Sequence, residues 1–191
     1  MTFDTKALLR LMKQSYRGGG IRIIRTDRGL RDRFFLSGAG WSLLIPKETC
    51  PGEITGQIVT WLADLPHIGY AAWVVKGFDP KPLDPAERDQ ALADCTAPSY
   101  VLGLKPLPLR TETDALVQLG TGQIAAFALE AFAVVSSGAN LGAFDPGALL
   151  ACWQDEVTEA RFWIWNDIDN VPENACTAAS ACRVWPDEKE N

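Results

Sequence analysis

The 191-residue sequence contains one histidine, His67, which excludes metal sites built from several histidines. A Ser-His-Asp hydrolase would have to use His67, but the sequence has no G-x-S-x-G motif to supply the nucleophile. A lone histidine between Pro66 and Ile68 favours a structural or surface role. The five cysteines are scattered, and no two stand in a C-x-x-C arrangement. The sequence therefore predicts neither a zinc site nor a disulfide framework.

Long hydrophobic runs are also lacking. The longest apolar stretch, residues 124–135, is interrupted by Glu130 and is shorter than a bilayer span, and the N-terminus has no signal-peptide core. With 47% hydrophobic and 22% charged residues, the chain has the composition of a folded globular protein. We therefore expect a cytoplasmic protein with no membrane contact.

The charge of the chain is unevenly distributed. Residues 1–33 carry nine basic and three acidic side chains, whereas the rest carries nine basic and twenty-one acidic ones, for a net charge of −6. Seven of the nine N-terminal cations are arginines, whose planar guanidinium groups suit phosphate. The segment either meets a polyanion such as DNA or pairs with the acidic remainder of the chain.

The periodicity of the sequence predicts an α+β fold with one small mixed sheet and helices packed around it. Helices are expected over residues 4–16, 51–64, 84–94 and 123–137, and from Asp145 through Val157. Strands are expected over residues 21–25, 34–36, 41–45, 68–75, 100–104, 115–119 and 161–165. We expect a single domain over residues 1–165 and an acidic, loosely ordered tail over residues 166–191.

A glycine turn, Gly120-Thr121-Gly122-Gln123, separates an apolar strand from an alanine-rich run. If that run is a helix, unpaired backbone N–H groups at its start favour a bound phosphate. The turn fits G-x-G-x-x-A, but it lacks the acidic residue expected about 20 positions later for a dinucleotide site, and no Walker A lysine follows. The alternative is a turn that needs glycine only for its backbone conformation.

Two carboxylates, Glu112 and Asp114, lie just before the strand that leads into the glycine turn. Carboxylate oxygens suit Mg²⁺ and also activate water, so this pair is the candidate metal and catalytic site. The alternative is a polar hairpin connection. Other acidic clusters, Asp155 with Glu159 and residues 167–173, fit an exposed acidic face, since the second lacks the central glycine of a calcium loop.

The strand, glycine motif and alanine-rich run of residues 115–126 resemble the corresponding elements of the ParB/sulfiredoxin family. The chain's size, basic N-terminal segment and MKQSY-RGGG opening are similar to the Osa-type fertility inhibition proteins of conjugative plasmids. The resemblance implies a nucleotide phosphate held by Gly120, Thr121, Gly122 and Gln123. Gln123 stands where the family has an arginine, so Arg110 or an N-terminal arginine would supply the cation.

This resemblance implies a fertility inhibition factor that binds and hydrolyses ATP with Mg²⁺ and cleaves DNA, thereby blocking conjugative transfer. Glu112 and Asp114 would hold the Mg²⁺ or position water, and Arg17, Arg22, Arg25 and Arg28 would contact the DNA. Components of a conjugative secretion system would be further partners. Two other classes stay open, namely a non-enzymatic inhibitor or immunity-type protein that binds another protein, and a domain that binds a small molecule.

Overall fold

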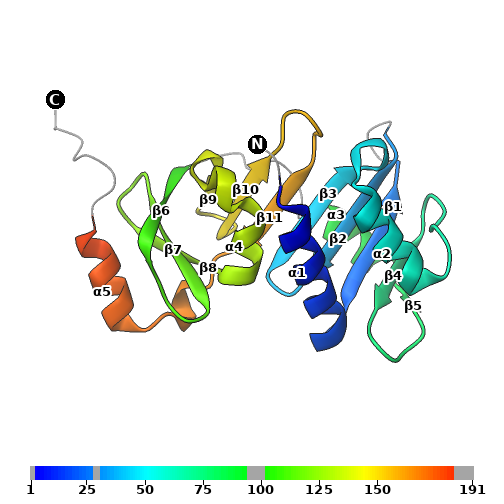
Figure 1. Ribbon diagram of the computed structural model, residues 1–191, viewed down its shortest axis with the longest axis horizontal. Helices are drawn as coiled ribbons and strands as arrows, with labels where there is room; N and C mark the ends of the chain where they lie inside the picture. Colours follow the sequence, from blue (N-terminus) through cyan, green and yellow to red (C-terminus); the bar gives the residue numbers. More distant parts are fainter. Residues whose placement is uncertain (1–2, 28–30, 94–101, 183–191) are drawn as a thin grey trace.

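A computed structural model of the chain describes residues 3–27, 31–93 and 102–182. Its strands form one antiparallel sheet in the order β5-β4-β1-β2-β3-β11-β10-β9-β6-β7-β8 (Figure 1). The strands are β1 (Ile21–Thr26), β2 (Arg33–Gly38), β3 (Trp41–Pro46), β4 (Ala71–Val74), β5 (Lys81–Pro82), β6 (Leu102–Arg110), β7 (Asp114–Leu119), β8 (Ile124–Ala128), β9 (Ala143–Asp145), β10 (Leu150–Gln154) and β11 (Arg161–Trp165). The helices of the described residues are α1 (Thr5–Gly18), α2 (Gly52–Leu62), α3 (Pro85–Ala93), α4 (Leu129–Val135) and α5 (Glu173–Ala181), with short 3-10 turns at Lys47–Thr49, Ser136–Leu141 and Ile168–Asn170.

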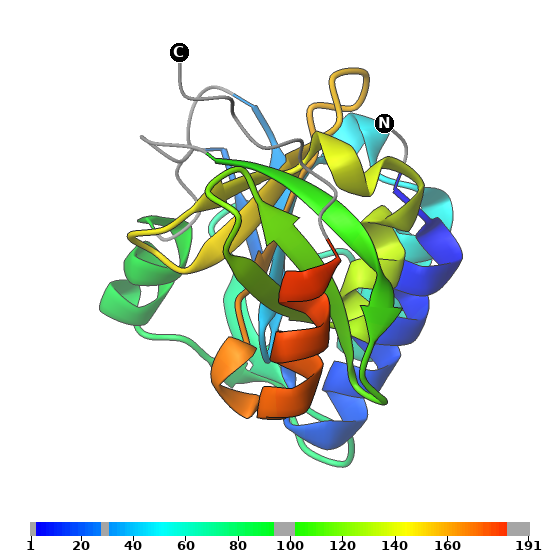
Figure 2. The same ribbon diagram turned by 90° about the vertical axis from the view of Figure 1, so that its left-hand side faces the viewer.

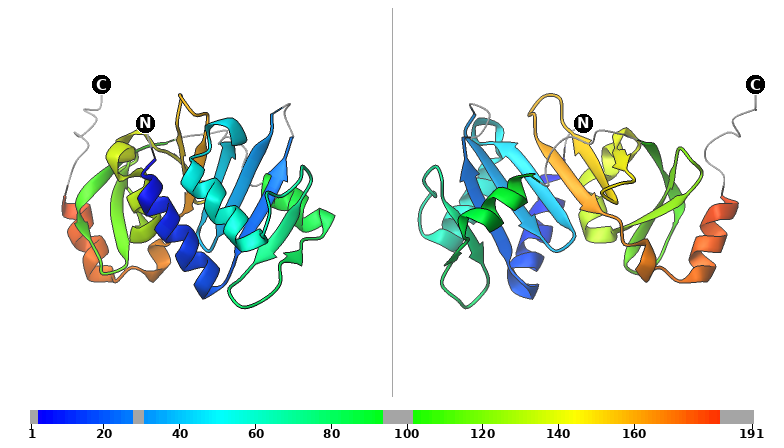
Figure 3. Two further views of the ribbon diagram at one scale, coloured as in Figure 1. Left: turned by 45° about the vertical axis from the view of Figure 1, so that its right-hand side comes forward. Right: turned by 180° about the vertical axis from the view of Figure 1, so that it is seen from behind.

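The first helix forms as its sequence predicts. The Asp4 carboxylate accepts a hydrogen bond from the backbone N–H of Ala7 at 2.9 Å, which caps the helix. Leu8, Leu11 and Met12 are buried against the sheet core. Helices α1 and α2 cover one face of the β1–β3 region, and α3 covers the opposite face (Figure 3).

The C-terminal half of the sheet curls back on itself. Strand β8 approaches the chain that follows β11, where the backbone N–H of Asp167 donates to the carbonyl oxygen of Ala126 at 2.9 Å. The side chain of Asn166 in turn accepts from the Ala126 N–H at 2.9 Å. Helix α5 lies against β6, β7 and β8 at this end of the molecule (Figure 2).

The alanine-rich run after the glycine turn departs from the sequence prediction. Residues 124–128 form strand β8, and only Leu129–Val135 form helix α4. Ala125 and Phe127 are buried in the main core, while Ala126 is buried in a second cluster beneath α5. Because both faces of β8 are covered, its side chains are all apolar and show no alternation. The prediction of one long helix over residues 123–137 was therefore wrong.

Three further expectations differ from the structure. The helix expected from Asp145 is instead the hairpin of β9 and β10, whose turn is held by the Asp145 carboxylate. The sheet is large and its described pairings are all antiparallel, rather than small and mixed. Residues 173–181 of the expected loose tail form α5, in which Ala179 is buried.

The α+β class itself is confirmed. None of the described helices is long and apolar enough to cross a membrane.

Candidate functional site

The glycine turn closes a β-hairpin instead of opening a helix. It connects β7 to β8, and Gly122 has the positive φ of +83° that such a turn favours. The N–H of Gly120 donates to the carbonyl of Gly103, and the N–H of Gly122 donates to that of Leu119, both at 2.8 Å. These two N–H groups therefore serve the sheet, and the helix N-terminus that was expected to favour phosphate lies elsewhere.

The two candidate carboxylates lie at the opposite end of β7 from this turn. Asp114 begins β7 and Gly120 follows its last residue, a separation of about 20 Å along an extended strand. Arg110 pairs with Ala115, at the same end as the carboxylates, and so it also lies a strand length from Gly120. The structure does not bring the predicted nucleotide-binding and metal-binding residues into one site.

Asp114 has a clear structural role in the β6–β7 turn. It is 4% exposed, and its Oδ2 atom accepts hydrogen bonds from the hydroxyls of Thr111 at 2.9 Å and Thr113 at 2.6 Å. Glu112 is exposed in the same turn. Among the described residues, no group of three or more His, Cys, Asp or Glu side chains gathers to hold a metal ion. With Asp114 bonded to two hydroxyls and no third such ligand nearby in the described residues, the Mg²⁺ site and the catalytic role of this pair stay predictions.

Replacing Asp114 with alanine is expected to destabilise the fold by about 1–3 kcal/mol, because two hydroxyls lose a charged acceptor. Asp114→Asn keeps one acceptor oxygen and should cost less. Urea unfolding of both variants, with and without Mg²⁺, measures the effect. An alanine variant as stable as the wild type would contradict the structural role, and Mg²⁺ that stabilises only the wild type would support a metal site.

Of the four arginines expected to contact DNA, Arg25 is the one paired within the protein, whereas Arg17 and Arg22 are described below. Arg25 is occupied internally, since its guanidinium donates to both carboxylate oxygens of Asp32 at 2.8 and 2.6 Å and to the carbonyl of Pro66 at 2.6 Å. The hydrogen bond from Arg25 lowers the pKa of Asp32 below its usual range, although partial burial opposes the shift. Arg25 is therefore a poor DNA ligand, and Arg28 lies outside the described residues.

The Arg25–Asp32 pair predicts a pH dependence of stability. Because the pKa of Asp32 is lower in the folded state, its contribution is complete above the unfolded value of about 3.9 and is lost as the pH falls below it. Asp32→Asn should therefore destabilise the protein at pH 7, by about 1.5–3 kcal/mol. Chemical denaturation from pH 7 to pH 2 should show the wild type and the variant converging in acid. A difference that stays constant down to pH 2 would refute this linkage.

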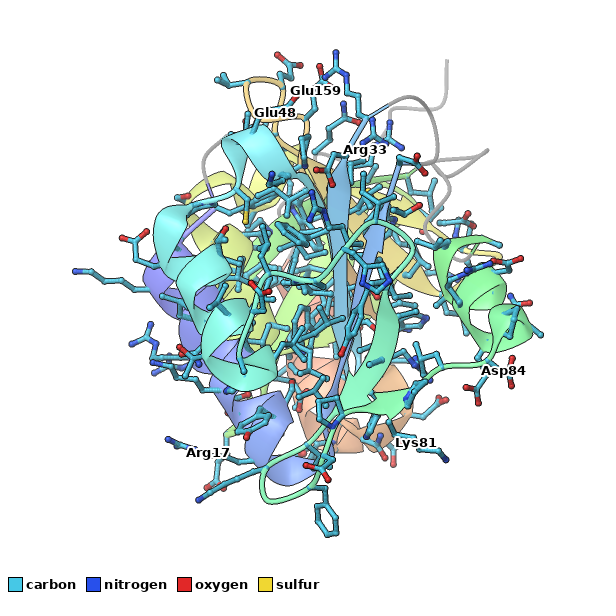
Figure 4. All side chains as sticks on the ribbon, turned by 90° about the vertical axis from the view of Figure 1, so that its right-hand side faces the viewer. Arg17, Arg33, Glu48, Lys81, Asp84 and Glu159 are labelled. Atoms are coloured by element: carbon cyan, nitrogen blue, oxygen red, sulfur yellow. The ribbon has the colours of Figure 1, made fainter. Side chains whose placement is uncertain are left out.

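Four other N-terminal cations form a stripe on α1. Lys6, Arg10, Lys13 and Arg17 are all exposed, and their spacings of four, three and four residues place them on one side of the helix. Arg17 lies at the C-terminal end of α1 (Figure 4). Within residues 3–27, 31–93 and 102–182, none of the four forms an ion pair. We call these four residues the α1 basic stripe.

Other basic side chains near the N-terminus are neutralised within the chain. Arg31 pairs with Glu159, and Lys47 lies 3.9 Å from Asp32. Arg22 differs from both, since its guanidinium carbon lies 5.2 Å from the ring centre of Trp73 and it makes no ion pair with any described residue. Internal pairing, one of the two interpretations of the N-terminal charge, thus holds for Arg25 and Arg31. Binding of an external polyanion by the other cations stays a prediction.

Two of the cysteines in the described part of the chain, Cys50 and Cys152, are poor nucleophiles. Cys152 on β10 is buried, and the loss of solvent raises the pKa of its thiol to about 11. Burial also raises the pKa of Cys50. Both thiols stay protonated at neutral pH, and a protonated thiol is a poor nucleophile and metal ligand.

No protein-family model, curated protein or solved structure matches this chain. Its function is therefore inferred from the arrangement of its own residues.

Proposed function

We propose that the protein binds the phosphate backbone of DNA through the α1 basic stripe. The observation that carries this proposal is a row of four exposed cations without an ion pair among the described residues, on a chain with a net charge of −6. Cations that stay unpaired beside an excess of acidic groups remain available to an external polyanion. DNA is such a polyanion. Binding is favoured because each phosphate that a cation contacts releases its counterions.

The geometry of α1 supports this proposal. The stripe spans the twelve residues from Lys6 to Arg17, or about 16 Å of helix, which is long enough to follow several phosphates along one strand. The opposite side of α1 is fixed to the core by Leu8, Leu11 and Met12. The side chain of Gln14 donates to Glu130 of α4 at 3.4 Å, which adds a contact between the two helices. A rigid helix presents the cations at fixed spacing, so little order has to be gained on binding.

DNA binding is the part of the Osa-type resemblance that this geometry supports best. Fertility inhibition, ATP hydrolysis and DNA cleavage stay predictions of the resemblance, as does the ParB/sulfiredoxin-like fold. The glycine turn expected to bind nucleotide and the carboxylates expected to bind Mg²⁺ lie at opposite ends of β7, which does not favour ATP hydrolysis at one joint site. Contacts to phosphate carry no sequence information, and we therefore propose binding with little sequence preference.

The test is the salt dependence of binding to a labelled duplex, measured by fluorescence anisotropy. Four phosphate contacts predict a slope of log K against log salt of about −3 to −4. Two duplexes of unrelated sequence should bind with similar affinity. Absence of binding at low salt would overturn the proposal and favour the alternative of a non-enzymatic protein that binds another protein.

A further inference from the structure

A row of polar and aromatic side chains crosses the sheet on the α3 side. The strand register pairs Arg22 with Trp73, Arg22 with Ser37, Ser37 with Ser42, and Ser42 with Trp163. Directly opposed residues of antiparallel strands point to the same face. This face is the one covered by α3, since Trp163 and Phe35 share a buried cluster with Ala91 of that helix.

A cavity of about 400 Å³ lies along this row. Arg22, Ser37 and Ser42 supply polar groups to its wall, and Phe35, Trp165 and Ala91 supply apolar ones. Small-molecule sites have this size and this mixture of an apolar wall with a few polar groups.

Two buried polar atoms beside this row have no hydrogen-bond partner within the described part of the chain. Ser37, which lines the cavity, is 4% exposed, and its hydroxyl makes no hydrogen bond. The indole Nε1 of Trp163, two pairings further along the row, is fully buried and equally unpaired. Folded proteins rarely leave buried donors unpaired, because the lost contact with water is not replaced. An unpaired hydroxyl in a cavity wall therefore indicates a ligand that accepts its hydrogen bond.

The cation of the cavity, Arg22, is exposed and contacts the face of a tryptophan ring. The Arg22 guanidinium lies 5.2 Å from the ring centre of Trp73. The Trp73 indole in turn rests on Gly20, where a Cβ atom would come within 2.3 Å of its Nε1 atom. Gly20 also has a φ of +106°, a conformation that other residues rarely adopt. The cation–π contact orients the guanidinium and leaves its N–H donors free for an oxyanion.

We propose that this cavity binds a small organic anion, in which a carboxylate or phosphate group is attached to a flat apolar body. The oxyanion accepts hydrogen bonds from Arg22 and from the hydroxyl of Ser37. The apolar body packs against Phe35 and Trp165. This binding site goes beyond the proposed DNA-binding function and does not depend on it, because the α1 basic stripe contributes no residue to the cavity.

The test is isothermal titration calorimetry with benzoate, phenyl phosphate and benzamide, which share one ring and differ in the attached group. We expect the two anions to bind and the uncharged amide to bind much more weakly. The tighter of the two anions identifies the oxyanion. Equal binding of benzamide, or no binding of any of the three at millimolar concentration, would overturn the proposal.

Two variants test the assigned contacts. Arg22→Gln should weaken anion binding by roughly tenfold or more, because a charged hydrogen bond is lost. Ser37→Ala should weaken it by roughly tenfold and yet raise the melting temperature of the free protein, since it removes an unpaired buried hydroxyl. A merely structural serine would not produce these opposite effects, and undiminished binding in either variant would contradict the assignment.

A matched control separates this site from the DNA surface. Arg17→Gln, on the α1 basic stripe, should leave anion binding unchanged while it weakens DNA binding. Arg22→Gln should weaken anion binding, and it should weaken DNA binding less than Arg17→Gln does, because Arg22 lies outside the stripe. Loss of anion binding in Arg17→Gln would overturn the position of the site, whereas failure of DNA binding in the wild type would leave the anion measurements intact.

Discussion

Replacing Arg10, Lys13 and Arg17 by glutamine in one triple variant is expected to weaken DNA binding by roughly a hundredfold to a thousandfold at 50 mM salt. Each lost phosphate contact also removes about 0.9 from the salt slope, so the slope should fall by about three. The three side chains are exposed and lack ion pairs with the described residues, and their loss should leave stability nearly unchanged. Fluorescence anisotropy over a salt series measures both quantities.

The matched control for this experiment is Arg31→Gln. It removes the same charge from a residue that pairs with Glu159, so its effect on DNA binding should be small. If the control weakens binding as much per charge as the triple variant does, the effect is one of net charge rather than of a defined surface. That result would contradict the α1 basic stripe as the binding site.

Replacing Trp153 with alanine is expected to have the largest effect on stability, a loss of about 3–5 kcal/mol. Trp153 on β10 is fully buried, and its indole N–H donates to the carbonyl of Ala139 at 3.2 Å. Its ring meets those of Phe127 and Phe132 edge-on, with centres 5.9 and 6.2 Å apart. These contacts join β10 to β8 and α4, so the substitution leaves a cavity where the curled half of the sheet closes.

Urea unfolding measures this loss, with Trp61→Ala as the control. Trp61 is only partly buried and stacks on Tyr16 with ring centres 4.5 Å apart. Its removal should cost clearly less than that of Trp153. Equal losses for the two variants would show that the aromatic cluster around Trp153 contributes no more than a surface contact.

The N-terminal half of the fold was predictable because its signals are local. The Asp4 cap and the spacing of Leu8 and Met12 define α1, and the turns at residues 18–20 and 38–40 bound β1, β2 and β3. Charge spacing alone also identified the exposed side of α1. These features depend on neighbours within about one helical turn or one hairpin.

The C-terminal half was not predictable in the same way. Residues 124–128 and 150–153 are continuous apolar runs, and such runs fit a buried helix as well as a strand covered on both faces. In the structure Ala151 and Trp153 lie in the main core, while Leu150 and Cys152 lie in the cluster beneath α3. Residues 150–153 are therefore part of a strand that is covered on both faces. Tertiary packing decided between the two structures.

The cavity beside Arg22 also depends on contacts between distant strands. Ser37 and Trp73 carry no sequence signal of their own, and they meet Arg22 only through the register of β1 with β2 and β4. The sequence identified Arg22 as a cation for DNA, but its neighbours and the unpaired hydroxyl follow only from the fold. Charge was readable from the sequence, whereas the surroundings of that charge were not.

The two hydrogen bonds that Ala126 makes, as donor to Asn166 and as acceptor from Asp167, have a consequence for self-association. They occupy the middle of the outer edge of β8, and the other outermost described strand, β5, has two residues, one of which is Pro82. Short or proline-containing edges resist the addition of a further strand from another chain. The sheet thus offers little template for aggregation or for an extended peptide, and its partners are expected to dock on helices and loops instead.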